Sequence, residues 1–270
     1  MKVSVVQMNS QDDKAHNLAE AERLIREVVA LERPRLVVLP ENFPFLGEGR
    51  DNIRGSADTF PGGAAYELIA GLAAELKVTI HAGSMIEDAG GSFYNTTVVF
   101  GADGKEIVRY RKIHLFDVDT PNGISYRESD AVSHGSDVVT YEIDGVTVGC
   151  SVCYDMRFPE LFRALRDKGA KIIVLPAAFT LQTGKDHWEP ILRARAIETQ
   201  TWFLASAQFG PHAPGRKACW GHSMVIDPWG HVVARCSDKV GFVSAHLDFA
   251  YQDSIREKLP CARHHILNQG

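Results

Sequence analysis

The sequence lacks the features that mark several large classes of protein. No apolar run in its 270 residues is long enough to cross a bilayer, so we expect no membrane-spanning helix and no membrane partner. The formal charge of −5 gives no basic excess to attract nucleic acid or an anionic lipid surface. Residues 1–7 alternate like a strand and polar residues follow from Asn9, which does not predict a signal peptide. A small molecule is therefore the expected partner.

Cysteine is also scarce, with only five residues. An odd number of widely spaced cysteines does not predict a disulfide framework, and it favours a reducing, cytoplasmic setting. Cys150 and Cys153 have the Cys-x-x-Cys spacing of some metal and redox sites, but no second pair accompanies them. Side chains three positions apart in a strand point to opposite faces, which argues against a shared metal. We expect neither a metal nor another cofactor.

The composition predicts one globular domain over residues 1–270. Hydrophobic residues make up 45% and charged residues 23% of the chain, which is enough to bury a large core, and no linker divides it. Periodicity and turn residues predict an alternation of helices and strands. We expect strands at 35–39, 78–85, 93–100 and 106–111, helices from Asp12 or Asp13 to Pro34 and over 64–76, 158–168 and 187–199, and loops over 47–63 and 112–137.

The second half of the chain repeats the order of the first. Residues 3–5 are similar to 146–148, residues 35–43 to 171–179, and residues 99–109 to 225–235. Repetition of a mixed strand and helix pattern predicts two similar halves, each with its own sheet. The expected fold is α/β, a four-layer α-β-β-α sandwich in which two sheets pack face to face and helices cover the outside.

One cysteine stands where strand-to-helix turns expose reactive groups. Residues 146–152 form an apolar run, and Pro159 suits the first turn of the helix that follows. Cys153 therefore lies at the junction, where backbone N–H groups favour a thiolate and can bind an oxyanion. The position of Cys150 within the strand predicts a buried structural thiol instead. We interpret Cys153 as a candidate nucleophile.

Two other residues are candidates to act with that thiol. Glu41 follows the strand 35–39, where the second half has Ala177, so its carboxyl is expected to be partly desolvated and able to take and return a proton near neutral pH. Lys112 leaves a strand beside apolar residues; turned inward, it would lower the thiol pKa and neutralise an oxyanion. A surface salt bridge for Glu41 and a solvated side chain for Lys112 remain open alternatives.

Three blocks of sequence resemble the signatures of the nitrilase superfamily of carbon-nitrogen hydrolases. They are residues 39–42 (Leu-Pro-Glu-Asn), 110–115 (Tyr-Arg-Lys-Ile-His-Leu) and 153–160 (Cys-Tyr-Asp-Met-Arg-Phe-Pro-Glu), and they occur in the order of the family. The similarity continues through residues 125–129, 183–189, 193–198 and 221–230, so it covers nearly the whole chain.

The resemblance implies a Glu-Lys-Cys triad. In that scheme Cys153 attacks the carbon of a C–N bond, and Lys112 and the backbone N–H of Tyr154 hold the oxyanion. Glu41 acts as general base and acid, and water then hydrolyses the thioester. Glu128 matches a second glutamate of the family site, where it would bind Lys112 or position the water; a surface charge is the alternative for it.

The similarity is greatest to the Nit-type amidases, which comprise deaminated glutathione amidases and ω-amidases. The resemblance therefore implies a hydrolase that releases ammonia or an amine from small amides bearing a carboxylate, such as deaminated glutathione or α-ketoglutaramate. A cation near the thiol is expected, and Arg157 is the candidate, with an internal salt bridge as its alternative. We also place Phe179 and Thr180 among the substrate-binding residues. The loop 209–217 could add positive charge at the pocket rim.

Other functions remain open at this stage. Nitriles and N-carbamoyl or β-ureido acids are substrates that the same triad could hydrolyse. A papain-like Cys-His pair would need His114, His187 or His222 beside the thiol, and packing roles are the alternative for each. A member of the fold that binds partners without catalysis would be a protein of another class. The family resemblance implies a homodimer or a higher homo-oligomer.

Overall fold

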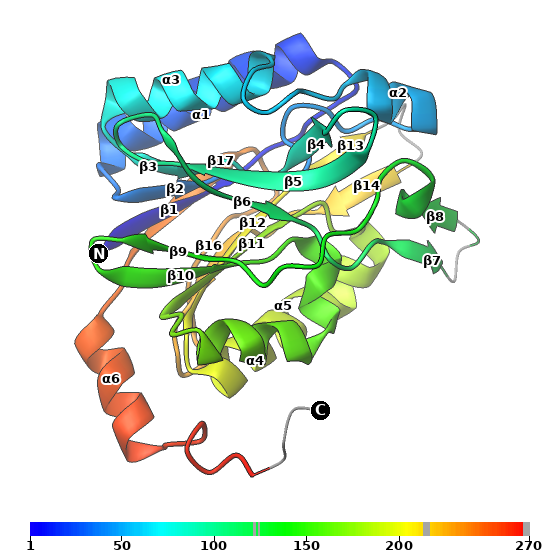
Figure 1. The fold of residues 1–270 in the computed structure, drawn as a ribbon. Helices are drawn as coiled ribbons and strands as arrows, with labels where there is room; N and C mark the ends of the chain where they lie inside the picture. The colour runs from blue at the N-terminus through cyan, green and yellow to red at the C-terminus, as the bar shows by residue number, and fades with distance from the viewer. Residues whose placement is uncertain (121–122, 124, 213–216, 267–270) are drawn as a thin grey trace.

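A computed structural model describes residues 1–120, 123, 125–212 and 217–266. Two β-sheets lie face to face with helices on their outer sides (Figure 1). The predicted four-layer α/β sandwich is confirmed. In Figure 1 the layer of α1 and α3 covers one sheet from above, and α4 and α5 cover the other from below.

The first sheet is built mainly from the first half of the chain. Its strands follow the order β17-β1-β2-β3-β5-β4, and β6 also pairs with β5. The central strands β1, β2 and β3 are parallel and almost wholly buried, as is usual where both faces of a sheet are covered. The strands are β1 (Lys2–Gln7), β2 (Leu36–Val38), β3 (Thr79–His81), β4 (Met85–Asp88), β5 (Phe93–Phe100), β6 (Glu106–Arg111) and β17 (Gly241–His246).

The second sheet follows the order β16-β15-β12-β11-β10-β9. Its central strands β10, β11 and β12 are again parallel, and antiparallel strands flank them on both sides. The strands are β9 (Thr140–Ile143), β10 (Val146–Cys150), β11 (Ile172–Ala177), β12 (Trp202–Ala207), β15 (Met224–Ile226) and β16 (Val232–Arg235).

The strand order shows that the two halves repeat one topology. In the first half β1, β2 and β3 are parallel neighbours, β3 pairs antiparallel with β5, and β5 pairs with β6. In the second half β10, β11, β12, β15 and β16 pair in the same order and with the same orientations. The three sequence similarities matched all of these strands except β3 and β12, and the predicted repetition is confirmed.

Helices connect the parallel strands in both halves, and their bounds follow from local sequence signals. Asp13 caps α1, with its carboxylate accepting a 3.0 Å hydrogen bond from the backbone N–H of His16. Pro159 occupies the first turn of α4, as predicted. The helices are α1 (Lys14–Glu32), α2 (Arg50–Gly55), α3 (Ala64–Leu76), α4 (Pro159–Asp167), α5 (Leu181–Thr199) and α6 (Phe249–Lys258), with short 3₁₀ turns η1 (Glu128–Asp130) and η2 (Cys153–Arg157).

The core has two parts that match the layers. A large cluster fills the space between the sheets and continues under α4 and α5; it includes Val5 and Val38 of the first sheet and Cys150 and Ile173 of the second. A second cluster lies between the first sheet and helices α1 and α3. The sheets are therefore fixed against each other by buried apolar side chains, so the loops at their carboxyl ends are held in register.

Several expected boundaries were wrong. The expected loop 47–63 contains α2, which is short and has no buried residue, so no apolar period marks it. The expected strand 78–85 is interrupted at Gly83, between β3 and β4, where the backbone has a left-handed conformation (φ +51°). Only glycine fits there, because a Cβ would lie 2.0 Å from the carbonyl oxygen of Pro40. The stretch 112–137, expected to be mostly loop, is so in its described part, and it also contains β7 (Asp117–Asp119), β8 (Ser125–Arg127) and η1. Helix α5 starts earlier than expected, at Leu181.

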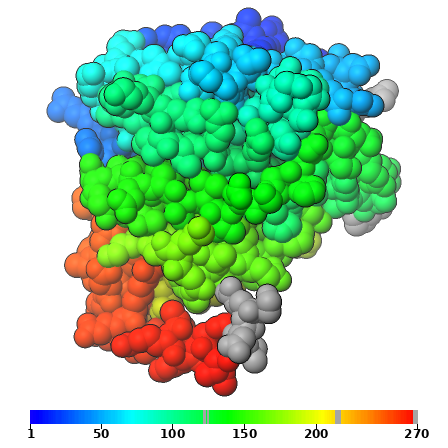
Figure 2. Space-filling model, in the orientation of Figure 1, coloured from blue at the N-terminus to red at the C-terminus, as the bar shows by residue number. Residues whose placement is uncertain are grey.

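A further hairpin and a C-terminal helix complete the fold. The expected loop 209–217 consists, in its described part, of β13 (Phe209–His212) and the start of β14 (Lys217–Trp220). Helix α6, which lies in the orange to red C-terminal part of Figure 2, packs beside the second half of the chain. Gln252 and Arg256 hold it there by hydrogen bonds to the backbone carbonyl of Gln200. No helix within the described ranges has both the length and the apolarity needed to span a membrane.

Candidate active site

Cys153 lies at the predicted strand-to-helix junction. It lies three positions after the end of β10 and begins η2 with φ +47°, a left-handed conformation that turns the chain sharply. The buried carboxylate of Asp155 holds this turn, because it accepts hydrogen bonds from the backbone N–H of Val152 (2.8 Å) and the hydroxyl of Tyr110 (2.6 Å). His114 binds the same carboxylate at 2.7 Å. The nucleophile candidate is therefore fixed by contacts from both sheets.

Glu41 lies next to this turn, at the carboxyl end of β2. Its side chain is buried, and the expected desolvation of the group is confirmed. One carboxylate oxygen accepts a 2.7 Å hydrogen bond from the backbone N–H of Ala178, which follows β11 of the other sheet. The other oxygen accepts from the Nζ of Lys112 (2.9 Å) and the Nδ2 of Asn95 (3.0 Å). These three donors fix the carboxylate in one orientation.

Lys112 is turned inward, as one of the two interpretations expected, and only 2% of its side chain is exposed. Its ammonium contacts Glu41 and also the Oε2 of Glu128, at 2.7 Å. Burial on its own would lower the pKa of Lys112, but the carboxylates of Glu128 and Glu41 outweigh it and hold the pKa well above its ordinary value. The lysine is therefore a permanent cation at the base of the site.

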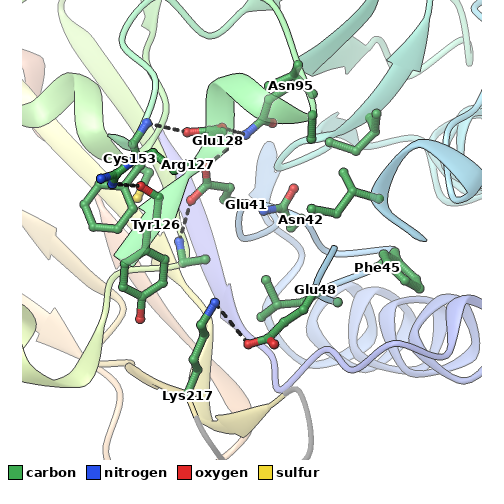
Figure 3. Close-up of a pocket in the computed structure, with 18 of the residues that line it drawn as sticks. Glu41, Asn42, Phe45, Glu48, Asn95, Tyr126, Arg127, Glu128, Cys153 and Lys217 are labelled. Carbon is green, nitrogen blue, oxygen red and sulfur yellow. Dashed lines mark hydrogen bonds and ion pairs between the residues drawn. The ribbon is translucent and has the colours of Figure 1, made fainter. Parts of the chain in front are cut away.

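Asn95 is a member of this cluster that sequence reasoning missed. Its Nδ2 donates to Glu41 and to the Oε1 of Glu128, both at 3.0 Å, so one amide bridges the two carboxylates (Figure 3). The signal in the sequence was a polar residue within the strand 93–100, where every second side chain is free to face a site instead of the core. The bridge reduces the repulsion between two carboxylates that share one lysine.

The electrostatic surroundings of the thiol favour its neutral form. Burial raises the pKa of Cys153 well above its ordinary value, and the carboxylate of Glu41 adds to the rise. Lys112 and the N–H of Ala178 act in the opposite direction. Since the first two effects outweigh the others, the thiol is protonated at neutral pH, and any reaction as a nucleophile requires a neighbouring base to take its proton.

A cavity of about 420 Å³ opens over this cluster. Glu41, Lys112, Glu128 and Cys153 all line it, so the structure brings four predicted residues together from four separate segments. Thr180, a predicted substrate-binding residue, also lines it. In Figure 3 Glu41 and Glu128 are near Cys153 in the upper part of the view, and the ion pair of Glu48 and Lys217 is in the lower part.

Three predicted residues are not among the described residues that line the cavity: Tyr154, Arg157 and Phe179. The guanidinium of Arg157 lies over the rings of Phe179 (5.4 Å) and Tyr154 (5.9 Å), and it approaches the Nδ1 of His187 at 3.3 Å. The alternative for Arg157, an internal salt bridge, is not found among the described residues either. A direct contact of these three side chains with substrate stays a prediction.

The residues of the rival interpretations lie elsewhere. Cys150 is fully buried in β10, and burial raises the pKa of its thiol. Of the histidines considered, His114 binds Asp155, His187 approaches Arg157, and His222 binds the backbone carbonyl of Trp220. Within the described ranges, no cluster of three or more His, Cys, Asp or Glu side chains is arranged to hold a metal ion.

Comparison with known proteins gives the same assignment over the whole length of the chain. Residues 2–257 match the carbon-nitrogen hydrolase family. The chain is 38% identical to a deaminated glutathione amidase from a Synechocystis species (97% of each chain) and 38% identical to omega-amidase NIT2-B of Xenopus laevis (97% of this chain, 94% of the relative).

Similarity to a solved structure extends this result to the fold. The NitFhit protein of C. elegans is 34% identical, with a TM-score of 0.89 over 98% of this chain and 64% of that longer chain. The family match, the two relatives and the shared fold agree with the geometry around Cys153. The chain belongs to the carbon-nitrogen hydrolase family, the nitrilase superfamily.

Proposed function

We propose that this protein is an amidase that hydrolyses small amides bearing a carboxylate through a thioester on Cys153. The observation that supports this most is the position of Glu41. Its buried carboxylate is oriented by Lys112 and the N–H of Ala178, and it influences the pKa of the thiol. A protonated thiol beside a fixed carboxylate is the arrangement that base-assisted attack requires.

The reaction has two stages in which Glu41 moves the proton. First, Glu41 takes the proton of Cys153 as sulfur attacks the amide carbon, and Lys112 with the backbone N–H of Tyr154 stabilises the oxyanion. The carbonyl re-forms as the C–N bond breaks, and Glu41 passes its proton to the nitrogen, which leaves as ammonia from a primary amide or as an amine from a substituted one. In the second stage Glu41 takes a proton from water, the hydroxide attacks the thioester, and the thiol is released with its proton restored.

Glu128 and Asn95 support this cycle without taking part in bond changes. The carboxylate of Glu128 accepts hydrogen bonds from the ammonium of Lys112, from the backbone N–H of Phe116 (2.7 Å) and from the amide of Asn95. These contacts hold Lys112 in one place while the charge on its other neighbour, Glu41, changes during each proton transfer. We assign Glu128 and Asn95 as positioning residues for Lys112 and Glu41.

Two observations support the substrate class. Relatives of 38% identity, which cover nearly all of this chain, carry the names deaminated glutathione amidase and omega-amidase. The cavity of about 420 Å³ suits a small molecule, and cationic side chains of Arg50, Arg127 and Lys217 line it together with the catalytic cluster. Acidic side chains, among them Glu48 and Asp130, line the cavity as well, so its preference for a carboxylate depends on pairing with an individual cation and not on net charge.

A substrate panel tests the proposal. Deaminated glutathione, α-ketoglutaramate, neutral amides, nitriles and β-ureido acids are each incubated with the protein. Turnover is measured as the amine released from deaminated glutathione and as ammonia released from the other compounds. We expect turnover to be highest for the two carboxylate-bearing amides and absent in a folded Cys153→Ala variant. Preferred turnover of nitriles or ureido acids would contradict the substrate class, and turnover by the variant would contradict the mechanism.

A further inference from the structure

The hairpin of β13 and β14 brings two unassigned residues to the cavity. His212 and Lys217 are directly opposite each other in the antiparallel register of this hairpin, and both line the cavity. Side chains directly opposite on one face of such a pair are close enough to contact the same ligand group. Neither residue belongs to the catalytic cluster around Cys153, so their presence in the cavity requires a separate explanation.

Lys217 makes an ion pair that a ligand can replace. Its Nζ lies 3.0 Å from the Oε1 of Glu48 and 4.5 Å from the centre of the Tyr126 ring. The lysine side chain is 20% exposed, whereas that of Glu48 is 42% exposed. The cation is thus held against the ring within the cavity, and its anionic partner reaches it from the surface loop before α2. A substrate carboxylate that replaces Glu48 keeps the charge of Lys217 paired, while Glu48, the more exposed partner, is hydrated in its place.

His212 offers a buried polar atom that lacks a partner. Only 9% of the residue is exposed, and its Nδ1 has no hydrogen-bond partner among the described residues. Burial, and then the nearby charge of Lys217, lower its pKa to about 4, so the ring is neutral at pH 7. Buried polar atoms in native proteins nearly always bind the protein, water or a ligand, so this nitrogen is available to bind a polar group of a molecule in the cavity.

The path from these residues to the catalytic cluster is short. Cys219 is two positions after Lys217 in β14 and also lines the cavity, and it forms a bridge with Thr180. Two residues of strand span about 7 Å. Glu41 is close enough to Cys219 to affect the pKa of its thiol, so β14 runs from Lys217 toward the base of the site.

We propose that Lys217 and His212 form the subsite that binds the carboxylate of the substrate. This inference rests on the proposed amidase function and names the residues that select its substrate. The carboxylate displaces Glu48 from the ammonium of Lys217 and accepts a hydrogen bond from the Nδ1–H of the neutral His212 ring. The amide end then reaches Cys153, and Glu48 returns to Lys217 when the product leaves.

The other cations in the cavity are less suitable. Lys112 is enclosed by two carboxylates. Arg127 donates to both carboxylate oxygens of Asp119, at 2.8 and 3.0 Å. Arg50 has an exposed side chain at the start of α2, where solvent weakens its attraction for an anion. The hairpin is the place in the described cavity where a partly buried cation and an unsatisfied buried nitrogen occur together.

Paired substrates give the kinetic test. The monoamide of glutaric acid is compared with pentanamide, in which a methyl group replaces the carboxylate. For Lys217→Met we expect KM for the monoamide to rise about tenfold or more, with kcat within about twofold and pentanamide unaffected, because only the charged contact is lost. His212→Leu should show a smaller rise, and His212→Asn, which keeps a donor near the Nδ1 position, should restore KM. Lys185→Met, an exposed lysine on α5, is the matched control.

A binding measurement separates this inference from the proposed function. Calorimetry with glutarate needs no turnover, so it reports on the subsite even if no amide is hydrolysed. We expect Lys217→Met to weaken glutarate binding about tenfold while Lys185→Met does not. Three results would overturn the proposal. One is an unchanged glutarate affinity in Lys217→Met, and another is an equal change in KM for the charged and the neutral amide in that variant. The third is that Arg157→Met, and not Lys217→Met, removes the preference for the charged amide. Absence of ammonia release from every amide, with glutarate binding as expected, would overturn only the amidase function.

Discussion

The two halves of the molecule have one topology but different residues at equivalent strand ends. In the first half β2 leads through Pro40 to Glu41, whereas in the second half β11 ends at Pro176 and Ala177. The next backbone N–H of the second half, that of Ala178, donates to the carboxylate of Glu41. One half thus supplies the charged group and the other supplies the backbone donor that orients it.

The ends of β1 and β10 also carry different residues at equivalent positions. Cys153 follows β10, and Ser10 is at the roughly equivalent position after β1. The Ser10 hydroxyl donates to the backbone carbonyl of Phe43 (2.8 Å) and accepts from the amide of Gln208 (2.9 Å), which also binds the backbone carbonyl of Glu41 (3.0 Å). Ser10 therefore supports the backbone around Glu41, the proposed base, whereas Cys153 is the proposed nucleophile. Repetition has produced one asymmetric site across the junction of the halves, not two.

The largest effect on activity is expected for substitution of Cys153, and its counterpart Ser10 should behave differently. Cys153→Ala should lower kcat/KM for the preferred amide by on the order of 10⁴-fold, because no other group can form the thioester. Ser10→Ala should lower the free energy of unfolding by about 1–3 kcal/mol, since the Phe43 and Gln208 groups lose their partner, with activity mostly retained. Ammonia release and denaturant unfolding measure the two results. A loss of activity in Ser10→Ala as large as in Cys153→Ala would show that the two positions do not differ in this way.

A second prediction concerns Glu41, whose equivalent position in the second half is occupied by Ala177. Glu41→Gln should lower kcat by roughly 10²- to 10⁴-fold, because the thiol loses its base. The carboxylate of Glu41 raises the pKa of Cys153, so Glu41→Gln should lower the thiol pKa. At any pH below the thiol pKa, the fraction of Cys153 present as thiolate should then increase. Alkylation of Cys153 by iodoacetamide, followed from pH 6 to pH 10, should therefore become faster while hydrolysis is lost. Glu67→Gln, on the exposed face of α3, is the control. Slower alkylation in Glu41→Gln would contradict the electrostatic account.

A smaller effect is expected at Asn95. Asn95→Ala removes two hydrogen bonds to carboxylates and should lower the free energy of unfolding by about 2–4 kcal/mol, with a partial loss of kcat. Asn95→Asp should be worse than Asn95→Ala at pH 8, because it places a third carboxylate beside Glu41 and Glu128. Thermal unfolding as a function of pH measures both. If Asn95→Asp proved as stable as the wild-type protein at pH 8, the bridging role would be wrong.

The smallest effect is expected at Cys150, which tests whether the Cys-x-x-Cys spacing matters. Cys150 is fully buried within β10, so Cys150→Ala should cost about 1–2 kcal/mol of unfolding free energy through lost packing. Activity should stay within about twofold of wild type, since the side chain does not line the described cavity. Ammonia release by a purified, folded variant measures this. A large loss of activity would favour a joint role for the two cysteines.

Much of the fold follows from the sequence because its signals are local. The bounds of α3, β5 and β6 agree with the expected ranges, since an apolar period or a glycine turn marks each. The helix α2 and the hairpin of β13 and β14 were expected as loops, because short elements rich in polar residues, glycine and proline have no apolar face that would reveal them. They are held by contacts with distant parts of the chain, which sequence periodicity does not report.

The same distinction applies to the site. The sequence placed Glu41 and Cys153 at the ends of clear apolar strands, and the family resemblance singled out Lys112; all three line the cavity. The loop 209–217 was expected at the pocket rim, but His212 and Lys217 were not singled out within it. The Ala178 N–H and Asn95 were not predicted, because their importance depends on which groups lie across the sheets from them. Arg157 was expected near the substrate from its position after the thiol, but the 3₁₀ turn η2 directs its guanidinium over the rings of Phe179 and Tyr154.

The most direct test of the central claim, that one thiol at the junction of the halves performs the chemistry, is stoichiometric labelling. The protein is treated with increasing iodoacetamide, and residual ammonia release is compared with the site of modification found by peptide mass spectrometry. Cys219 lines the same cavity and serves as an internal alternative. We predict that activity falls to zero in proportion to the fraction of Cys153 modified, and that modification of the exposed Cys261 alone leaves activity unchanged. Full modification of Cys153 with activity retained, or inactivation that follows modification of Cys219 instead, would contradict the account.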